Sequence, residues 1–208
     1  NSLDACEEAR ISAVIEVEIS KVKGKKDEHI LVAKDNGPGI PYASIAKAFG
    51  RLLFGSRFHT ISQTRGQQGI GITGVVMYSQ LTTGKHTHII SKVAEEGVAV
   101  HMDIGIDTRR NRALKSNNIR DVWLDEHGID IPHGVKIEAH MKARYQKGGK
   151  SVYQYLRMTS IVNPHAAISF RLVNEDGAVI EQASWPAVTE KLPAPVKEIL
   201  PHPHGVEI

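Results

Sequence analysis

The sequence predicts an α+β fold: a two-layer sandwich in which a mixed β-sheet carries helices on one face. Two observations favour this fold. Helical and strand-like periodicities follow one another along the chain, and a glycine-rich loop lies between two predicted helices with strands on both sides. A chain of 208 residues, 41% of them hydrophobic, is long enough to bury a substantial core in one large domain.

The first elements are a helix and two strands. Leu3, Cys6 and Arg10 recur at three- to four-residue spacing, which predicts a helix over residues 1–10. No cap precedes it and residue 1 is Asn instead of Met, so we expect the sequence to start inside a helix. Apolar and polar residues alternate over residues 15–20, which predicts a half-buried strand before a charged turn.

The remaining elements follow from the same two periodicities. We expect strands over 29–34, 88–92, 98–104, 135–141 and 168–173, and helices over 42–49, 75–84 and 151–160. Gly84 is a suitable end for the second of these helices. The proline-rich segment from residue 186 onward predicts a linker.

The composition excludes several classes of protein. The single Cys6 excludes a disulfide framework and fits a reducing compartment. No apolar stretch approaches the ~18 residues of a membrane span, so we expect a soluble cytoplasmic protein with no membrane partner. The net charge of +3 permits an acidic partner without requiring one.

A carboxylate at the end of the second predicted strand is the first candidate site. Asp35 precedes Asn36-Gly37-Pro38-Gly39, and glycines let a flat ligand approach the backbone. A buried carboxylate accepts strongly from an amine donor such as the exocyclic amine of adenine. The alternative is an Asx-type turn between strand and helix, for which Asp-Asn-Gly-Pro is ordinary chemistry.

The loop from Gly66 to Gly74 is the second candidate site. It precedes a predicted helix, whose free N–H groups and positive dipole end favour phosphate. The stretch from Gly69 to Gly74 matches G-x-G-x-x-G, but no strand precedes it as a dinucleotide-binding fold requires. No Gly-Lys-Ser/Thr closes a P-loop either. Glycines needed only for helix packing remain the alternative.

The third candidate is Asn1, which shares a helix face with Asp4 and Glu8. Its amide oxygen could coordinate Mg²⁺ beside a triphosphate. Taken together, the three clusters resemble the successive nucleotide-binding boxes of the GHKL (Bergerat-fold) ATPases, which include gyrase, MutL-type repair proteins, 90-kDa heat-shock chaperones and histidine kinases. Within that superfamily, residues 1–9, 49–59, 65–72 and 77–84 most resemble the B subunits of type IIB DNA topoisomerases, the topoisomerase VI group.

This resemblance implies a role for each matching residue. Asn1 would bind Mg²⁺ and phosphate, Asp35 would read adenine, and Gly39 would lie against the base. Ser56 and Arg57 match a lid pair near the nucleotide where the family usually has Lys; Arg also contacts phosphate, with different geometry. The phosphate loop would comprise Gly66, Gln67, Gln68, Gly69, Ile70, Gly71, Ile72 and Thr73.

The resemblance also implies the wider function. ATP and Mg²⁺ would be the cofactors, and the partners would be the A subunit of topoisomerase VI, a second B subunit in an A2B2 heterotetramer, and duplex DNA. No catalytic residue is expected in this chain, because the general-base Glu would precede Asn1. Residues 1–187 would form the ATP-binding domain, and 188–208 a linker and the start of a helix–two-turns–helix domain. The host would be a prokaryote, an archaeon, with the protein at the nucleoid.

Two further groups of residues have competing interpretations. His86 with His88, and His202 with His204, form pairs that could bind a metal but lack further ligands at zinc spacing. Arg109, Arg110, Arg112 and Lys115 form a basic run, expected between strands, that could touch DNA phosphates or simply face water. Three other functions stay open: a MutL- or kinase-type GHKL ATPase, a non-catalytic nucleotide-switched module, and a dinucleotide oxidoreductase.

Overall fold

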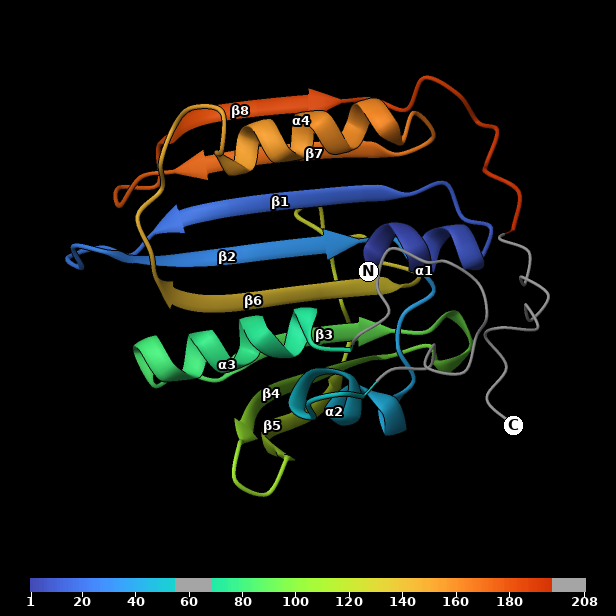
Figure 1. Cartoon of the computed structure of the whole chain (residues 1–208). Helices are drawn as coiled ribbons and strands as arrows, with labels where there is room; N and C mark the ends of the chain where they lie inside the picture. Colours follow the sequence, from blue (N-terminus) through green and yellow to red (C-terminus); the bar gives the residue numbers. More distant parts are fainter. Residues whose placement is uncertain (55–68, 196–208) are drawn as a thin grey trace, which may run out of the picture.

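The structure, a computed structural model, describes residues 1–54 and 69–195 and confirms the predicted α+β sandwich (Figure 1). Within these residues, eight strands form a single sheet in the order β5-β4-β3-β6-β2-β1-β7-β8. Figure 1 shows the helices α1 to α4 lying on the same face of this sheet. The sheet is mixed: β1 and β7 pair in parallel, and every other pair of neighbouring strands is antiparallel.

Along the chain, the elements are helices interspersed with runs of one to three consecutive strands. They are α1 (Ser2–Glu8), β1 (Val14–Lys21), β2 (Glu28–Asp35), α2 (Tyr42–Gly50), α3 (Gly71–Thr83), β3 (Thr87–Lys92), the short 3-10 helix η1 (Ala94–Glu96), β4 (Ala99–Asp107), β5 (Arg112–Asp121), β6 (Gly134–Lys142), α4 (Val152–Val162), β7 (Ala167–Val173) and β8 (Val179–Trp185).

Two apolar clusters join the helices to the sheet. In the first, Leu3 and Cys6 of α1 and Leu156 of α4 pack against β1 and β7. In the second, α2 and α3 pack against β3, β4 and β6, with Ile45 and Val76 completely buried. Side chains alternate between faces along a strand, so the polar positions of β1 and β6 point to the other face.

That second face carries no helix among the described residues. One corner of it is covered by the segment between β5 and β6, which passes behind the sheet in Figure 1. Trp123 of this segment is buried against Ile90 and Ala99. No described helix is long and apolar enough to cross a bilayer.

Most predicted elements are confirmed, with bounds that differ by a few residues. Gly84 ends α3 in the left-handed conformation, at φ 74°, and the Ser151 hydroxyl caps α4 by accepting from the Gln154 N–H at 3.2 Å. The prediction that Arg10 belongs to the first helix is wrong. Arg10 has φ 59°, and α1 ends at Glu8.

The two strands at the edges of the sheet, β5 and β8, were not predicted. Almost every side chain of β5 is exposed, so its sequence lacks the apolar alternation that identifies a half-buried strand. This also corrects the placement of the basic run. Arg112 and Lys115 lie inside β5, while Arg109 and Arg110 lie in the turn that precedes it.

Candidate functional site

Asp35 is the last residue of β2 and lies between Ile15 of β1 and Val135 of β6 in the sheet. Its side chain is buried, with 8% of the residue exposed. The carboxylate accepts three hydrogen bonds: from the Ser2 hydroxyl at 2.6 Å, from the Gly37 N–H at 3.0 Å and from the Val135 N–H at 3.3 Å. These donors hold both carboxylate oxygens in one orientation.

The bond from Gly37 to Asp35 shows that the Asx-type turn expected as the alternative is present. It does not compete with a ligand-binding role. An ionised carboxylate has about four acceptor positions, and three protein donors leave one for a ligand. Oδ2 receives only one of the three bonds, from Ser2, so an amine donor would approach this oxygen.

The segment after Asp35 is fixed by hydrogen bonds to distant strands. The Asn36 side chain accepts from the Val14 N–H at 2.7 Å and donates to the Ser12 carbonyl. The Ser91 hydroxyl of β3 accepts from the Ile40 N–H at 2.7 Å and donates to the Ile40 carbonyl. An irregular loop therefore has the rigidity that a binding site needs.

Both glycines of the loop have a packing reason to be glycine. Gly39 has φ 79°, and a Cβ there would overlap the backbone carbonyl of Lys92. A Cβ on Gly37 would come within 3.0 Å of Asp35 Oδ1 and 3.5 Å of Cys6 Sγ. This packing is a separate reason for these residues to be glycine, and the expected approach of a flat ligand to Gly39 stays a prediction. The two glycines allow the loop to lie directly on its protein neighbours.

Helix α1 covers the carboxylate from one side. Asn1 is its exposed N-terminal residue, and the Asn1 side chain makes no capping hydrogen bond. The helix is anchored by the Glu7 carboxylate, which lies 2.8 Å from Nε2 of the buried His165. Burial, and then the charge of Asp35, raise the pKa of the Cys6 thiol to about 12, so this thiol stays protonated at neutral pH.

The start of α3 supplies the second half of the site. The helix begins at Gly71, earlier than predicted, with no acidic residue in its first turn. Its first amides therefore point outward with the positive end of the helix dipole, which suits an anion. Ile40, in the loop that follows Asp35, and Ile72 both pack against the apolar cluster that contains Ile45 and Val76, so both segments border the same part of the core.

The residues predicted for the phosphate loop differ in their surroundings. A Cβ on Gly71 would meet no atom of the described residues within 4 Å, so that part of the structure leaves the space beside this residue open. Thr73 is completely buried, and its hydroxyl bonds to the Ile70 carbonyl at 3.1 Å instead of facing outward. Ser56, Arg57, Gly66, Gln67 and Gln68 lie outside the described residues. We call α1, residues 35–41 and the first turn of α3 the Asp35 site.

A buried carboxylate next to a helix N-terminus suits a ligand with an amine at one end and phosphates at the other. The model of the family described as histidine kinase-, DNA gyrase B- and HSP90-like ATPase matches residues 1–108. The chain belongs to this family. All described parts of the Asp35 site lie inside the matched range, so the ATPase region of this GHKL chain includes them.

Curated relatives make the resemblance more specific. The chain is 47% identical to the B subunit of type 2 DNA topoisomerase 6 from Methanococcoides burtonii and 48% identical to that from Archaeoglobus fulgidus, in each case over 100% of this chain and 32% of the relative. It thus spans about a third of their length. Among solved structures, the ATPase and transducer domains of DNA topoisomerase II from Balamuthia mandrillaris match with a TM-score of 0.48 at 15% identity, covering 87% of this chain and 46% of that one.

The site of this GHKL chain fits a magnesium ion that takes most of its ligands from a nucleotide. Asn1 offers an exposed amide oxygen without a capping bond, and Mg²⁺ in phosphate sites is held by one or two protein oxygens plus substrate phosphates. The described residues hold no cluster of three or more His, Cys, Asp or Glu arranged for a metal. A metal held entirely by protein side chains is therefore not found in that part of the chain.

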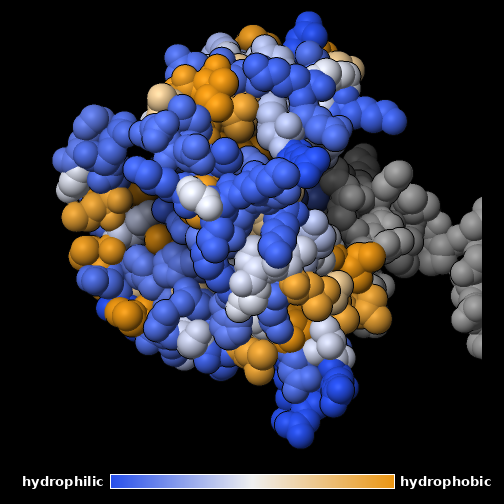
Figure 2. All heavy atoms as spheres, turned by 90° about the vertical axis from the view of Figure 1, so that its left-hand side faces the viewer, coloured by the Kyte–Doolittle hydropathy of each residue, from blue (hydrophilic) through white to orange (hydrophobic). Residues whose placement is uncertain are grey.

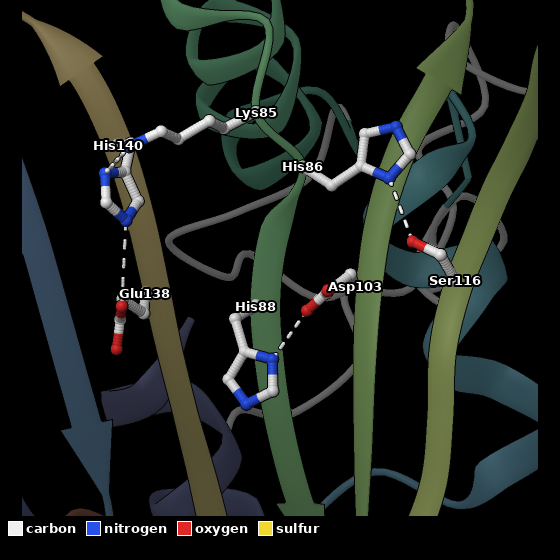
Figure 3. Close-up of a pocket in the computed structure, with 7 residues that line it drawn as sticks. All are labelled: Lys85, His86, His88, Asp103, Ser116, Glu138 and His140. Carbon is white, nitrogen blue, oxygen red and sulfur yellow. Dashed lines mark hydrogen bonds and ion pairs between the residues drawn. The ribbon is translucent and has the colours of Figure 1, made fainter.

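The His86 and His88 pair lines a hollow on the second face of the sheet (Figure 3). This hollow of about 460 Å³ is lined by Lys85, His86, His88, Asp103, Ser116, Glu138 and His140. His88 Nδ1 lies 2.6 Å from Asp103 Oδ1, and His140 Nε2 lies 3.8 Å from Glu138 Oε1. These side chains pair with one another, so they do not converge on a metal. His202 and His204 lie outside the described residues.

Three residues that shape the Asp35 site were missed by the sequence interpretation. Ser2 bonds to the Asp35 carboxylate, Ser91 holds Ile40, and His133 Nδ1 lies 2.9 Å from the Gly37 carbonyl. Each is separated from its partner by 33 to 96 positions in the chain. No local pattern signals such a contact, because only the folded sheet brings these segments together.

Proposed function

We propose that this chain is the ATP-binding part of the B subunit of a type IIB DNA topoisomerase. The observation that carries this proposal is the Asp35 carboxylate, buried and held by three donors with one acceptor position left. The relatives named as B subunits of topoisomerase 6 support the choice of enzyme within the family.

Each residue of the site would have a separate task. Asp35 would accept the exocyclic amine of adenine, and the amides of Gly71 and Ile72 at the start of α3 would bind phosphate. Asn1 would hold Mg²⁺, which neutralises phosphate charge when bound. Ser56, Arg57, Gly39 and the glutamines of the loop would complete the pocket, and a Glu one helical turn before Asn1 would activate water.

The wider mechanism would be an ATP-gated clamp. Nucleotide binding would favour a dimer of B subunits, the A subunit would cut and rejoin one duplex, and hydrolysis would reset the gate. Such coupling requires that ATP bind one conformation more tightly than the other. Residues 1–187 would form the ATPase domain, and residues 188–208 would lead into the next domain.

The test is ATP-dependent decatenation of linked DNA circles by the full-length protein together with its A subunit. We expect activity with ATP, none without it, and none with the Asp35→Asn variant. ATP-dependent dimerisation without any strand passage would instead identify a nucleotide-switched assembly module. Strand nicking that does not need the A subunit would point to a MutL-type enzyme.

A further inference from the structure

A concentration of positive charge lies where α2 meets the β4–β5 hairpin. Residues 42–54 and 107–121 contain seven Lys and Arg and two Asp, a net charge of +5, whereas the whole chain carries +3. The remaining residues are therefore net negative. We call the following six side chains the α2–β5 basic corner: Lys47, Arg51, Arg109, Arg110, Lys115 and Arg120.

All six residues are exposed, and none forms an ion pair with a described residue. The two carboxylates of these segments bond to backbone N–H groups: Asp121 Oδ1 accepts from the Val122 N–H at 2.8 Å, and Asp107 bonds within the hairpin turn. Asp107 Oδ1 accepts from the N–H groups of Arg109 and Arg110, both at 3.1 Å. The charge of the corner is thus left for an external partner.

The fold holds the two halves of the corner together. Gly50 ends α2 directly on β5, where a Cβ would overlap the side chain of Ala113. Asn111, in the hairpin turn at φ 48°, accepts from the Leu52 N–H at 2.8 Å and donates to the Leu52 carbonyl at 3.2 Å. The segment after α2 is therefore tied to the tip of the hairpin.

The register of β5 directs its charges toward the helix side. Lys115 pairs with Ile104 and Arg120 pairs with Val100, and both partners belong to the apolar cluster under α2 and α3. Lys47 lies in the last turn of α2, and Arg51 follows directly after the helix in an extended conformation. The hairpin turn forms the strongly hydrophilic projection at the bottom of Figure 2. The two β5 cations thus lie on the side of the hairpin that α2 covers, and the other four belong to the hairpin turn and to the last turn and end of α2.

We propose that the α2–β5 basic corner binds the phosphate backbone of duplex DNA. This inference rests on the proposed function, which makes duplex DNA the substrate. A ten-residue strand is roughly 33 Å long, close to one turn of a duplex, whose phosphates present a dense, regular negative charge. Asn118 on the same strand, which bonds to Tyr42 on the helix side, offers an amide of the kind that often contacts phosphate oxygens.

A duplex fits better than a single strand. Single strands are held largely by aromatic rings that stack on bases. The ring of Tyr42 at this corner is covered by the Arg120 guanidinium, 5.1 Å from the ring centroid, and its hydroxyl accepts from Asn118 at 2.7 Å. This face of the Tyr42 ring is therefore not open for stacking on a base. The contacts that remain for a nucleic acid are ionic contacts and hydrogen bonds.

The test compares two triple variants of the full-length protein that change net charge equally. One is Arg109→Glu with Arg110→Glu and Lys115→Glu; the control is Lys23→Glu with Lys25→Glu and Lys26→Glu in the exposed β1–β2 turn. Binding of a fluorescent 40-base-pair duplex is followed by anisotropy across a NaCl series. We expect the corner variant to bind more than tenfold more weakly at 100 mM NaCl and its salt slope to fall by about 2.7, or 0.9 per lost contact. The control should stay within twofold.

A variant with neutral side chains controls for misfolding caused by the introduced glutamates. Arg109→Gln with Arg110→Gln and Lys115→Gln removes the charges without adding carboxylates beside Asp107, and should show the same loss of salt slope. ATP affinity should be unchanged in all variants, because none alters the Asp35 site.

Three results would overturn the proposal: wild-type affinity and salt slope in both corner variants, an equal loss in the control, or a loss confined to single-stranded DNA, RNA or an acidic protein. Absence of ATP-dependent strand passage in the wild type, with duplex binding still dependent on the corner, would instead refute the proposed function alone.

Discussion

The Asp35 site and the α2–β5 basic corner use charge in opposite ways. Asp35 is buried, and three protein donors fix its carboxylate. The cations of the corner are exposed and have no ion-pair partner among the described residues. A buried, hydrogen-bonded group recognises one chemical pattern, because any mismatch leaves it unpaired in a medium of low dielectric constant. Exposed cations attract any polyanion, and their number sets the strength.

The largest effect should come from removing the Asp35 charge. Asp35→Asn keeps the shape but puts an amide among three N–H and O–H donors, and it removes the charged acceptor for adenine. A hydrogen bond to a charged group contributes about 1.5–3 kcal/mol, so the ATP affinity measured by isothermal titration calorimetry should fall by roughly 10- to 150-fold. Asp176→Asn, in the exposed β7–β8 turn, should bind ATP normally. An unchanged ATP affinity in the Asp35→Asn variant would show that Asp35 does not recognise adenine.

Two glycine variants should separate binding from folding within the Asp35 site. Gly71→Val adds a side chain in open space beside the start of α3, so it should block phosphate while leaving thermal stability nearly unchanged. Gly39→Ala forces a Cβ onto the Lys92 carbonyl at φ 79°, which costs roughly 1–3 kcal/mol of strain. Its Tm should fall by several degrees. Retained ATP binding in Gly71→Val would contradict the phosphate role of this loop.

Salt should distinguish the two regions directly. If the corner makes four to six phosphate contacts, raising NaCl from 50 to 200 mM should weaken duplex binding by roughly a hundredfold or more. ATP affinity should change only severalfold, because partly buried interactions are screened much less than exposed ones. Parallel titrations of one preparation with ATP and with a duplex measure both slopes. Equal slopes would mean that the two regions do not differ in the way proposed.

Acidification should produce the smallest effect, on the β4–β5 side of the sheet. Burial, and then the neighbouring His88, hold the pKa of His101 below its ordinary value of 6.5; Asp121 opposes the shift and Lys136 adds to it. The unfolded chain therefore binds a proton at a pH where the folded chain does not. The free energy of unfolding is therefore highest above pH 6.5, where His101 is neutral in both states, and it decreases as the pH falls toward the pKa of His101 in the folded protein.

A Tm series from pH 7.5 to 5.5 measures the acid effect, and His101→Gln serves as the reference because it cannot titrate. The wild type should lose more stability than this variant over the interval. Identical pH dependence in the two proteins would show that His101 does not carry the effect.

Helices and internal strands could be predicted because each has one apolar face. Ile45 and Phe49 identify α2, and Ile15 and Ile19 identify β1, through spacing alone. The edge strands β5 and β8 could not be predicted in this way. Little of their surface is buried, so packing imposes no alternation of apolar and polar residues on their sequence. The expected position of the basic run between strands is confirmed for Arg109 and Arg110 and wrong for Arg112 and Lys115, which lie in β5, for the same reason.

By itself, the sequence determined the family and the residue types of the nucleotide site, since Asp35 and the glycines around it form short local motifs. Only the tertiary structure decided the state of these residues. It brought Ser2 and Val135 to the Asp35 carboxylate, put the Lys92 carbonyl against Gly39 and joined α2 to the β4–β5 hairpin. The physical reason is that motifs are local in sequence, whereas burial and hydrogen bonding depend on segments that the sheet brings together from distant parts of the chain.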